Sequence, residues 1–123
     1  MKNKLNHSVK FREGYRPYAP SILIEYSKDW LELKQPSPFM LMVCKVKSEK
    51  AKLVPAITHI DRTTRPQEVN KSDSPIYWEL INEFYKRTDV PMLLNTSFNI
   101  NREPIVETPE DALICALGTE IDY

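Results

Sequence analysis

Short apolar runs, each ended by proline or polar residues, predict a small set of β-strands. The clearest runs are residues 21–25, 39–46 and 92–94, and the partly β-branched run 39–46 is typical of a central strand. Residues 57–61 alternate between apolar and polar, a pattern that is also typical of a strand. Residues 62–69 are expected to return antiparallel to them. The pattern therefore predicts a sheet.

Two segments repeat apolar residues at helical spacing instead. Ser74 and Pro75 form a typical helix start, and an apolar face runs from there to about Arg87, formed by Tyr77, Leu80, Ile81 and Phe84. Thr108 is expected to cap a second helix, with acids in its first turn. Residues 112–117 of that helix are small and apolar, so we expect it to be buried. Strands and helices together indicate an α/β (α+β) fold.

Composition limits the classes of function. The 123 residues suffice for one domain with its own core, and 17 basic side chains balance 17 acidic ones. A net charge of zero argues against nucleic acid as a partner, although it permits a local basic pocket. No apolar run reaches transmembrane length, and the polar, basic start does not resemble a signal peptide, so no membrane is expected and the predicted location is cytoplasmic.

Cysteine and glycine usage excludes several kinds of site. Cys44 and Cys115 lie apart in apolar runs without paired histidines, which predicts buried, reduced thiols and no metal site. The only glycines are Gly14 and Gly118, too few for a glycine-rich phosphate loop. A phosphate site in this chain must therefore use side chains and ordinary turns.

The most informative stretch comes after the predicted strand 92–94. Its apolar character changes within one residue to a run of small amide and hydroxyl side chains: Asn95, Thr96, Ser97 and Asn99. Ligands collect at the carboxyl ends of strands in open α/β sheets, and these groups can donate hydrogen bonds to phosphate oxygens. An Asx-type turn between two elements explains the same residues equally well.

Two further groups of polar residues are candidates. Lys10 and Arg16 lie in a basic arm, and the proline-rich sequel 17–20 would present them from a rigid segment, where two cations can hold different phosphates. A solvated arm without a ligand is the alternative. His59, Asp61 and Arg65 are expected near a strand end, where they could orient one another, although a lone histidine is more often structural.

Several separated blocks resemble one known family. Residues 95–99, 103–106 and 108–113, which read Asn-Thr-Ser-Phe-Asn, Glu-Pro-Ile-Val and Thr-Pro-Glu-Asp-Ala-Leu, are similar to the carboxy-terminal domain of O-carbamoyltransferases of the NodU/CmcH type. The blocks at 10–13, 16–21 and 55–61 match it too. The resemblance implies one domain over residues 1–123 with a YrdC-like, twisted mixed β-sheet and flanking helices.

The resemblance also implies a chemistry. Such domains are taken to bind ATP and carbamoyl phosphate and to form carbamoyl adenylate, after which a large actin-like domain transfers the carbamoyl group to an acceptor hydroxyl. The family's functional positions fall on Lys10, Arg16, Arg65, Ser97 and Asn99, with Thr96 beside them as a further nucleotide contact. Positioning and charge stabilisation suffice for this reaction, and Mg²⁺ is expected to arrive with the nucleotide.

Two features set this chain apart from the family pattern. Arg62 and Arg102 stand where glycine is common, and each glycine could serve a backbone conformation that arginine disfavours or a close approach that arginine obstructs. The large domain is also absent from these residues, so complete transfer by this chain alone is not expected. Two hypotheses remain: an adenylate-forming half-enzyme, or a non-catalytic binding or regulatory domain that needs a partner carrying the large domain.

Overall fold

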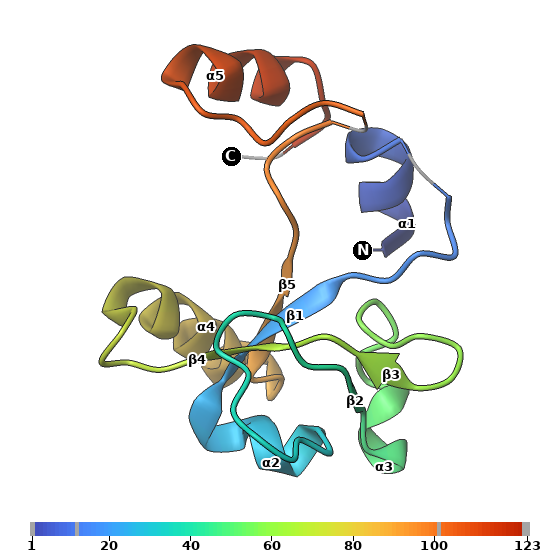
Figure 1. Cartoon of the computed structure of the whole chain (residues 1–123), viewed down its shortest axis with the longest axis vertical. Coiled ribbons are helices and arrows are strands. Elements are labelled where there is room, and N and C mark those ends of the chain that lie inside the picture. Colours follow the sequence, from blue (N-terminus) through green and yellow to red (C-terminus); the bar gives the residue numbers. More distant parts are fainter. Residues whose placement is uncertain (1, 12, 101, 122–123) are drawn as a thin grey trace. The chain divides into compact units, whose positions relative to one another are not determined.

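The computed structural model describes residues 2–11, 13–100 and 102–121 (Figure 1). Contacts group the chain into two compact units, one formed by residues 1–16 with 96–123 and the other by residues 17–95. The second unit contains the sheet. The first contains the amino-terminal arm and the carboxyl-terminal helix.

A three-stranded mixed sheet organises the second unit. β1 (Ala19–Leu23) lies in the middle, β4 (Gln67–Val69) pairs parallel to it, and β5 (Met92–Asn95) pairs antiparallel on its other side. Ser21 is opposite both Gln67 and Leu93 in the register. The predicted mixed sheet with flanking helices is thus confirmed, and β1 and β5 lie close to the predicted strands 21–25 and 92–94.

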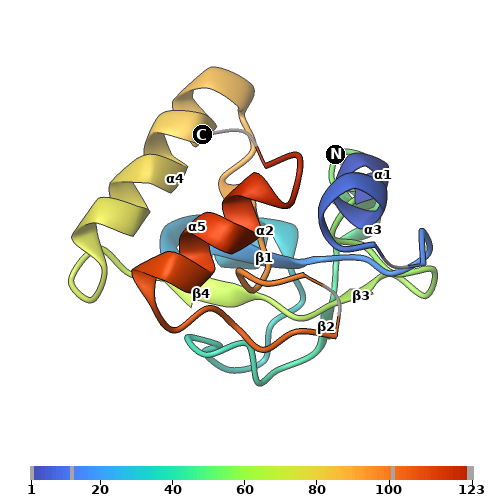
Figure 2. The same cartoon turned by 90° about the horizontal axis from the view of Figure 1, so that it is seen from above.

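The two faces of this sheet pack against different elements. Ile22 and Met92 belong to a core with Trp30 of α2 (Ser27–Trp30), and Tyr26 of η2 (Ile24–Tyr26) packs against it. The other core residues come from the segments after α2: Leu31, Cys44, Val46, Val54 and Ile57. On the opposite face, Leu23 and Val69 pack against Ile81 of α4 (Pro75–Thr88). Figure 2 shows α4 at one side of the three-stranded sheet. Alternation along the strands therefore sends successive side chains into two separate apolar clusters.

The predicted central strand at 39–46 is wrong. Phe39, Leu41 and Val43 are 75%, 79% and 63% exposed, and only β2 (Cys44–Lys45) forms, antiparallel to β3 (Thr63–Thr64). The run is apolar, but prolines at 36 and 38 precede it, and within it only Cys44 and Val46, near its end, belong to the core.

The predicted strand at 57–61 is also wrong. These residues form turns, and only Ile57 reaches the core. The expected return strand divides in two, because β3 pairs with β2 while β4 crosses to the three-stranded sheet. The charged residues 45–52 contain the short helix α3 (Ser48–Ala51).

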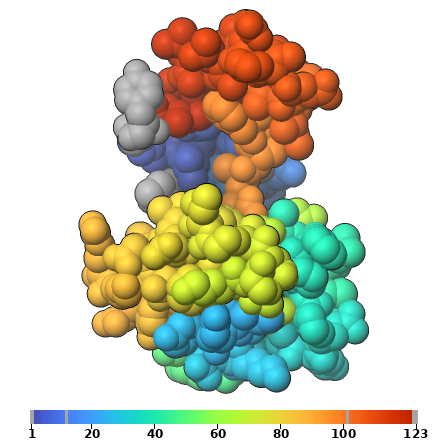
Figure 3. All heavy atoms as spheres, turned by 90° about the vertical axis from the view of Figure 1, so that its left-hand side faces the viewer, coloured from blue at the N-terminus to red at the C-terminus, as the bar shows by residue number. Residues whose placement is uncertain are grey.

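The predicted helix from Pro75 is confirmed. α4 lies at the surface of the second unit, where its yellow and gold atoms are plainly visible in Figure 3. Ile81 is fully buried, whereas Leu80 and Phe84 are 57% and 39% exposed, so only part of the predicted apolar face is covered. The helix ends at Asp89 in the left-handed conformation.

The first unit contains α1 (Lys2–Lys4), the π-helical turn η1 (Leu5–Val9) and α5 (Pro109–Leu117). Thr108 caps α5 as predicted, in a capping box with Asp111. Burial of this helix is not confirmed, because Cys115 is buried whereas Leu113, Ile114 and Leu117 are exposed. Cys115 and Cys44 are both buried free thiols, as expected. No helix in the described part of the chain combines the length and apolarity that a membrane span requires.

Candidate functional site

Lys10 is placed by the helical turn that precedes it. It closes η1, where its backbone N–H donates to the Leu5 carbonyl at 2.8 Å, and it keeps a helical backbone conformation. Its side chain is buried, with 5% exposure, which is rare for lysine unless oxygen atoms surround the ammonium group. The local fold therefore directs one cation of the basic arm inward.

The Lys10 ammonium group is surrounded by oxygens of the loop after β5. It donates to the Ser97 carbonyl, to the Asn99 carbonyl at 2.9 Å and to Asn99 Oδ1 at 2.8 Å, with Ser97 Oγ at 3.4 Å. Ser97 Oγ in turn donates to Asn99 Oδ1 at 2.6 Å. Lys10 therefore contacts two residues of the same unit that lie 87 and 89 positions away in the sequence. We call these three residues the Lys10–Ser97–Asn99 cluster.

The loop carries its own support. Asn99 Nδ2 donates to the Glu103 carbonyl at 2.8 Å, and the Val106 N–H donates to the Phe98 carbonyl at 3.1 Å. Arg102 lies between them with φ of 69°, in the left-handed region that favours glycine. The loop thus folds back on itself, and its sharp reversal explains why a glycine would suit position 102.

The cluster has the donors that a phosphate group needs. The Lys10 ammonium and the Ser97 hydroxyl converge on Asn99 Oδ1, while the carboxamide N–H of Asn99 donates to the Glu103 carbonyl. A phosphate oxygen could take the place of Asn99 Oδ1 as acceptor for both Lys10 and Ser97 after a rotation of one side chain. Hydrogen bonds to a charged phosphate oxygen are stronger than hydrogen bonds to a neutral amide oxygen, which favours replacing Asn99 Oδ1 by phosphate as the acceptor.

Arg16 belongs to the same unit but points elsewhere. Its side chain is 54% exposed and forms a 3.8 Å ion pair with Glu13. The buried Asn6 donates to the Arg16 carbonyl at 3.2 Å and fixes the backbone there. Arg16 is therefore a surface cation on an anchored backbone, and it makes no contact with the cluster among the described residues. Sequence reasoning missed Asn6, since nothing in the polar arm distinguishes a buried amide.

The remaining predicted residues lie outside the cluster. Thr96 is exposed at the start of the loop, and its side chain makes no hydrogen bond within the described residues. Arg65 is exposed on the connection between β3 and β4, in the second unit. Asn95, the last residue of β5, hydrogen-bonds Ser21 and Gln67 within the sheet.

The residues around His59 form a turn. Asp61 accepts from both the side chain and the backbone of Thr63, and these hydrogen bonds lower the pKa of its carboxyl. The His59 carbonyl accepts from the N–H of Arg62, which has a positive φ of 66°. Arg62 also donates to Ser48 Oγ. These contacts give the segment a structural role, and they again place an arginine in a conformation that suits glycine.

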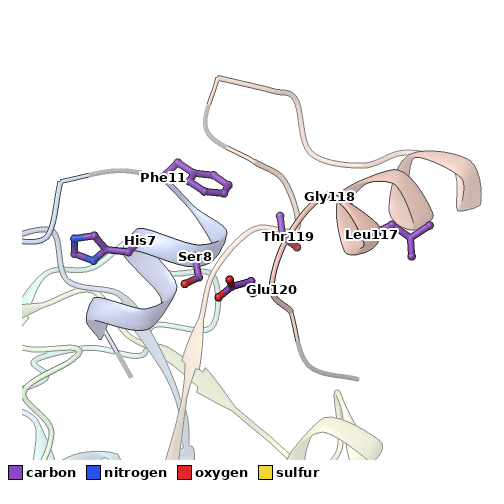
Figure 4. Close-up of a pocket in the computed structure, with 7 residues that line it drawn as sticks. All are labelled: His7, Ser8, Phe11, Leu117, Gly118, Thr119 and Glu120. Carbon is purple, nitrogen blue, oxygen red and sulfur yellow. The ribbon is translucent and has the colours of Figure 1, made fainter.

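An open hollow of about 410 Å³ lies in the first unit, between η1 and the end of α5 (Figure 4). Ser8 and Glu120 lie side by side in it, with the Glu120 N–H donating to the Ser8 carbonyl at 3.3 Å, while the His7 ring points away. Phe11 and Leu117 add apolar surface. The hollow includes none of the predicted site residues, and its carboxylate is unfavourable for an anion. Within the described residues, no group of three or more acidic, histidine or cysteine side chains could hold a metal ion.

The chain is similar in sequence to several known proteins. The family model described as carbamoyltransferase C-terminus matches residues 1–123. Nodulation protein NolNO of Sinorhizobium fredii is 49% identical over 98% of this chain, and nodulation protein NolO of Bradyrhizobium diazoefficiens is 47% identical over 98%. Nodulation protein U of Rhizobium tropici is 36% identical over the whole chain.

The match covers only part of these relatives. The chain spans 18%, 23% and 21% of their respective lengths, about a fifth in each case. Because the family match includes both compact units, the Lys10–Ser97–Asn99 cluster and the sheet lie within one family domain. The chain therefore belongs to the carbamoyltransferase C-terminus family.

Proposed function

We propose that this chain binds carbamoyl phosphate and ATP and forms carbamoyl adenylate as one part of an O-carbamoyl-transferring enzyme. Carbamoyl phosphate, ATP and water would give carbamoyl adenylate, phosphate and pyrophosphate. The observation that carries the proposal is the meeting of Lys10, Ser97 and Asn99, because the ammonium group of the amino-terminal arm contacts a hydroxyl and an amide of the loop after β5.

The roles of these residues rest on their chemistry. Lys10 would neutralise phosphate charge, Ser97 would donate its hydroxyl proton to a phosphate oxygen, and Asn99 would hold both in place. Arg16 and Arg65 would supply the further cations that two polyanionic ligands need, and Thr96 would add a hydroxyl contact to the nucleotide. Mg²⁺ would enter on the triphosphate, because acidic ligands for it are not gathered in the described residues.

Transfer of the carbamoyl group to an acceptor would need more protein than these residues. Relatives are about five times longer, which supports a large partner domain that carries the acceptor site. The same observation favours a second candidate, a binding or regulatory domain that has no chemistry of its own until it docks on that partner.

Calorimetric titration of the purified chain tests the proposal. Carbamoyl phosphate and Mg·ATP are titrated separately and together into the natural chain, into Ser97→Ala and into Arg65→Ala. Loss of one hydrogen bond to a charged ligand should weaken binding roughly tenfold or more in Ser97→Ala. Ser72→Ala is the matched control, because Ser72 is exposed and its hydroxyl donates to its sequence neighbour Asp73.

The two candidate functions differ in the step after ligand binding. Pyrophosphate release that needs both ligands and falls in the Ser97→Ala variant supports the adenylate-forming reaction. Binding without pyrophosphate release supports the regulatory domain. Equal affinity in the natural chain and in both site variants, or no heat with either ligand, would refute the proposed site.

A further inference from the structure

Three polar side chains form a hydrogen-bonded triad on one face of the sheet in the second unit. Ser21 of β1 donates through Oγ to Gln67 Oε1 of β4 at 3.0 Å. Asn95 of β5 donates through Nδ2 to Ser21 Oγ at 2.9 Å and to Gln67 Oε1 at 2.8 Å. One residue from each strand therefore takes part in the triad, and Ser21 is completely buried beneath the two amides.

The triad interrupts an apolar face. Leu23 and Val69 are the next residues on the same face, two register pairs further along, and they pack against Ile81 of α4. Leu93, beside Asn95 on that face, packs against the same cluster. Buried polar groups in a sheet give less stability than apolar ones unless all their hydrogen bonds are made, so the bonding of each polar atom in the triad matters.

One donor and one acceptor of the triad are unused. Gln67 Oε1 accepts two bonds, Ser21 Oγ accepts one and donates one, and Asn95 Nδ2 donates two. Gln67 Nε2 and Asn95 Oδ1 have no hydrogen-bond partner among the residues that the structure describes. Both side chains are only partly exposed, and Asn95 Nδ2 lies 2.8 Å from Gln67 Oε1, so the two carboxamide groups are direct neighbours; we call this pair of carboxamides the patch.

We propose that this patch is a recognition site for a planar group with a hydrogen-bond acceptor next to an amino group. Gln67 Nε2 donates to the acceptor of the ligand, and Asn95 Oδ1 accepts from its amino group. Two ligand groups share this chemistry: the carbamoyl group, O=C–NH₂, and the N1/N6 edge of adenine. Which ligand brings the group rests on the proposed function, whereas the recognition itself does not.

Phosphate-free probes test the site separately from the Lys10–Ser97–Asn99 cluster. The side-chain amide resonances of Asn95 and Gln67 are followed in ¹H–¹⁵N spectra of the full chain. Methyl carbamate is compared with methyl acetate, which replaces NH₂ by CH₃. Adenosine is compared with purine riboside, which lacks the amino group. We expect the two amide resonances to shift with the amino-bearing member of a pair and much less with its control.

The probe that shifts the resonances identifies the ligand group. A response to methyl carbamate assigns the patch to the carbamoyl group, and a response to adenosine assigns it to the nucleobase. In Gln67→Glu the carboxylate still accepts from Ser21 and Asn95 but has lost the donor, so the triad persists while binding weakens roughly two- to tenfold or more. An unchanged thermal unfolding midpoint confirms that the variant is folded.

Failure of this inference differs from failure of the proposed function. Equal responses to both members of each pair, no response to any probe, or the same affinity in Gln67→Glu would overturn the recognition site. Those results would leave phosphate binding by Ser97 and Asn99 intact. Conversely, loss of phosphate binding would not alter the response to methyl carbamate or adenosine.

Discussion

Replacing Lys10 by methionine should loosen the first unit without disturbing the second. Lys10 links the amino-terminal arm to the loop after β5 through bonds to Ser97 and Asn99. Methionine has a similar length and keeps most of the apolar contact, but it cannot donate. The change therefore isolates the contribution of the ammonium group.

The magnitude depends on the number of bonds and their exposure. The ammonium group has three protons, and a bond to a charged group contributes about 1.5–3 kcal/mol net. Burial of the charge opposes this gain by several kcal/mol. Ser97 is exposed and Asn99 is partly exposed, so water can hydrogen-bond to the two backbone carbonyls that lose the Lys10 donor. We expect the free energy of unfolding to fall by about 2 kcal/mol, well below the sum of the bonds.

Urea unfolding and native-state hydrogen exchange measure the effect. The Val106 amide, which donates to Phe98 within the loop, should exchange faster in Lys10→Met than in the natural chain. Arg16→Ala is the control, because its exposed 3.8 Å ion pair is expected to contribute less than about 1 kcal/mol. An unfolding midpoint and a Val106 exchange rate that stay unchanged in Lys10→Met would refute this account of the buried lysine.

Local geometry supports four more predictions. Arg102→Gly should raise stability by about 1 kcal/mol because φ is positive there, whereas Arg87→Gly in α4 should lower it by about the same amount; chemical denaturation compares them. Thr108→Ala should cost about 1 kcal/mol by removing the cap of α5. The hydrogen bonds from Thr108 lower the pKa of the Asp111 carboxyl in the folded chain. The stability that these bonds contribute is therefore fully present above the carboxyl pKa of the unfolded chain, and it is lost as the pH falls through the lower pKa of the folded chain. Measuring the free energy of unfolding at decreasing pH would detect this loss. Burial, with Glu32 and Glu68, raises the pKa of Cys44 to about 11, so iodoacetamide should react with it far more slowly at pH 9 than with the urea-unfolded chain; equal rates would contradict its burial. Ile81→Ala should cost about 2–5 kcal/mol, and Ile76→Ala, 86% exposed, should be nearly neutral in the same denaturation experiment.

Local signals in the sequence predicted several elements well. The serine–proline start of α4, the threonine cap of α5 and the apolar strand β5 depend on interactions within a few residues, so they can be read directly. The unusual arginines at 62 and 102 were also informative. Glycine is common at these two positions in the family pattern, which suggested a backbone conformation that favours glycine. Both arginines indeed have a positive φ.

The sequence failed where burial depends on distant partners. The apolar run at 39–46 suggested a central strand, yet Phe39 and Leu41 are exposed because no other element covers them. The pairing of β4 with β1, rather than with residues 57–61 as predicted, depends on contacts 46 residues apart. Periodicity indicates which residues are apolar but not what they pack against.

The candidate site shows the same division. Lys10, Ser97 and Asn99 could be named from sequence blocks, but only the tertiary structure shows them in contact and leaves Arg16 paired with Glu13. Of the Ser21–Gln67–Asn95 triad, the sequence singled out only Asn95, because the three residues come from three different strands. Residue type and local order determined the family and the helix ends. Side-chain burial and long-range register, which depend on the folding of the whole chain, decided which polar groups share a site.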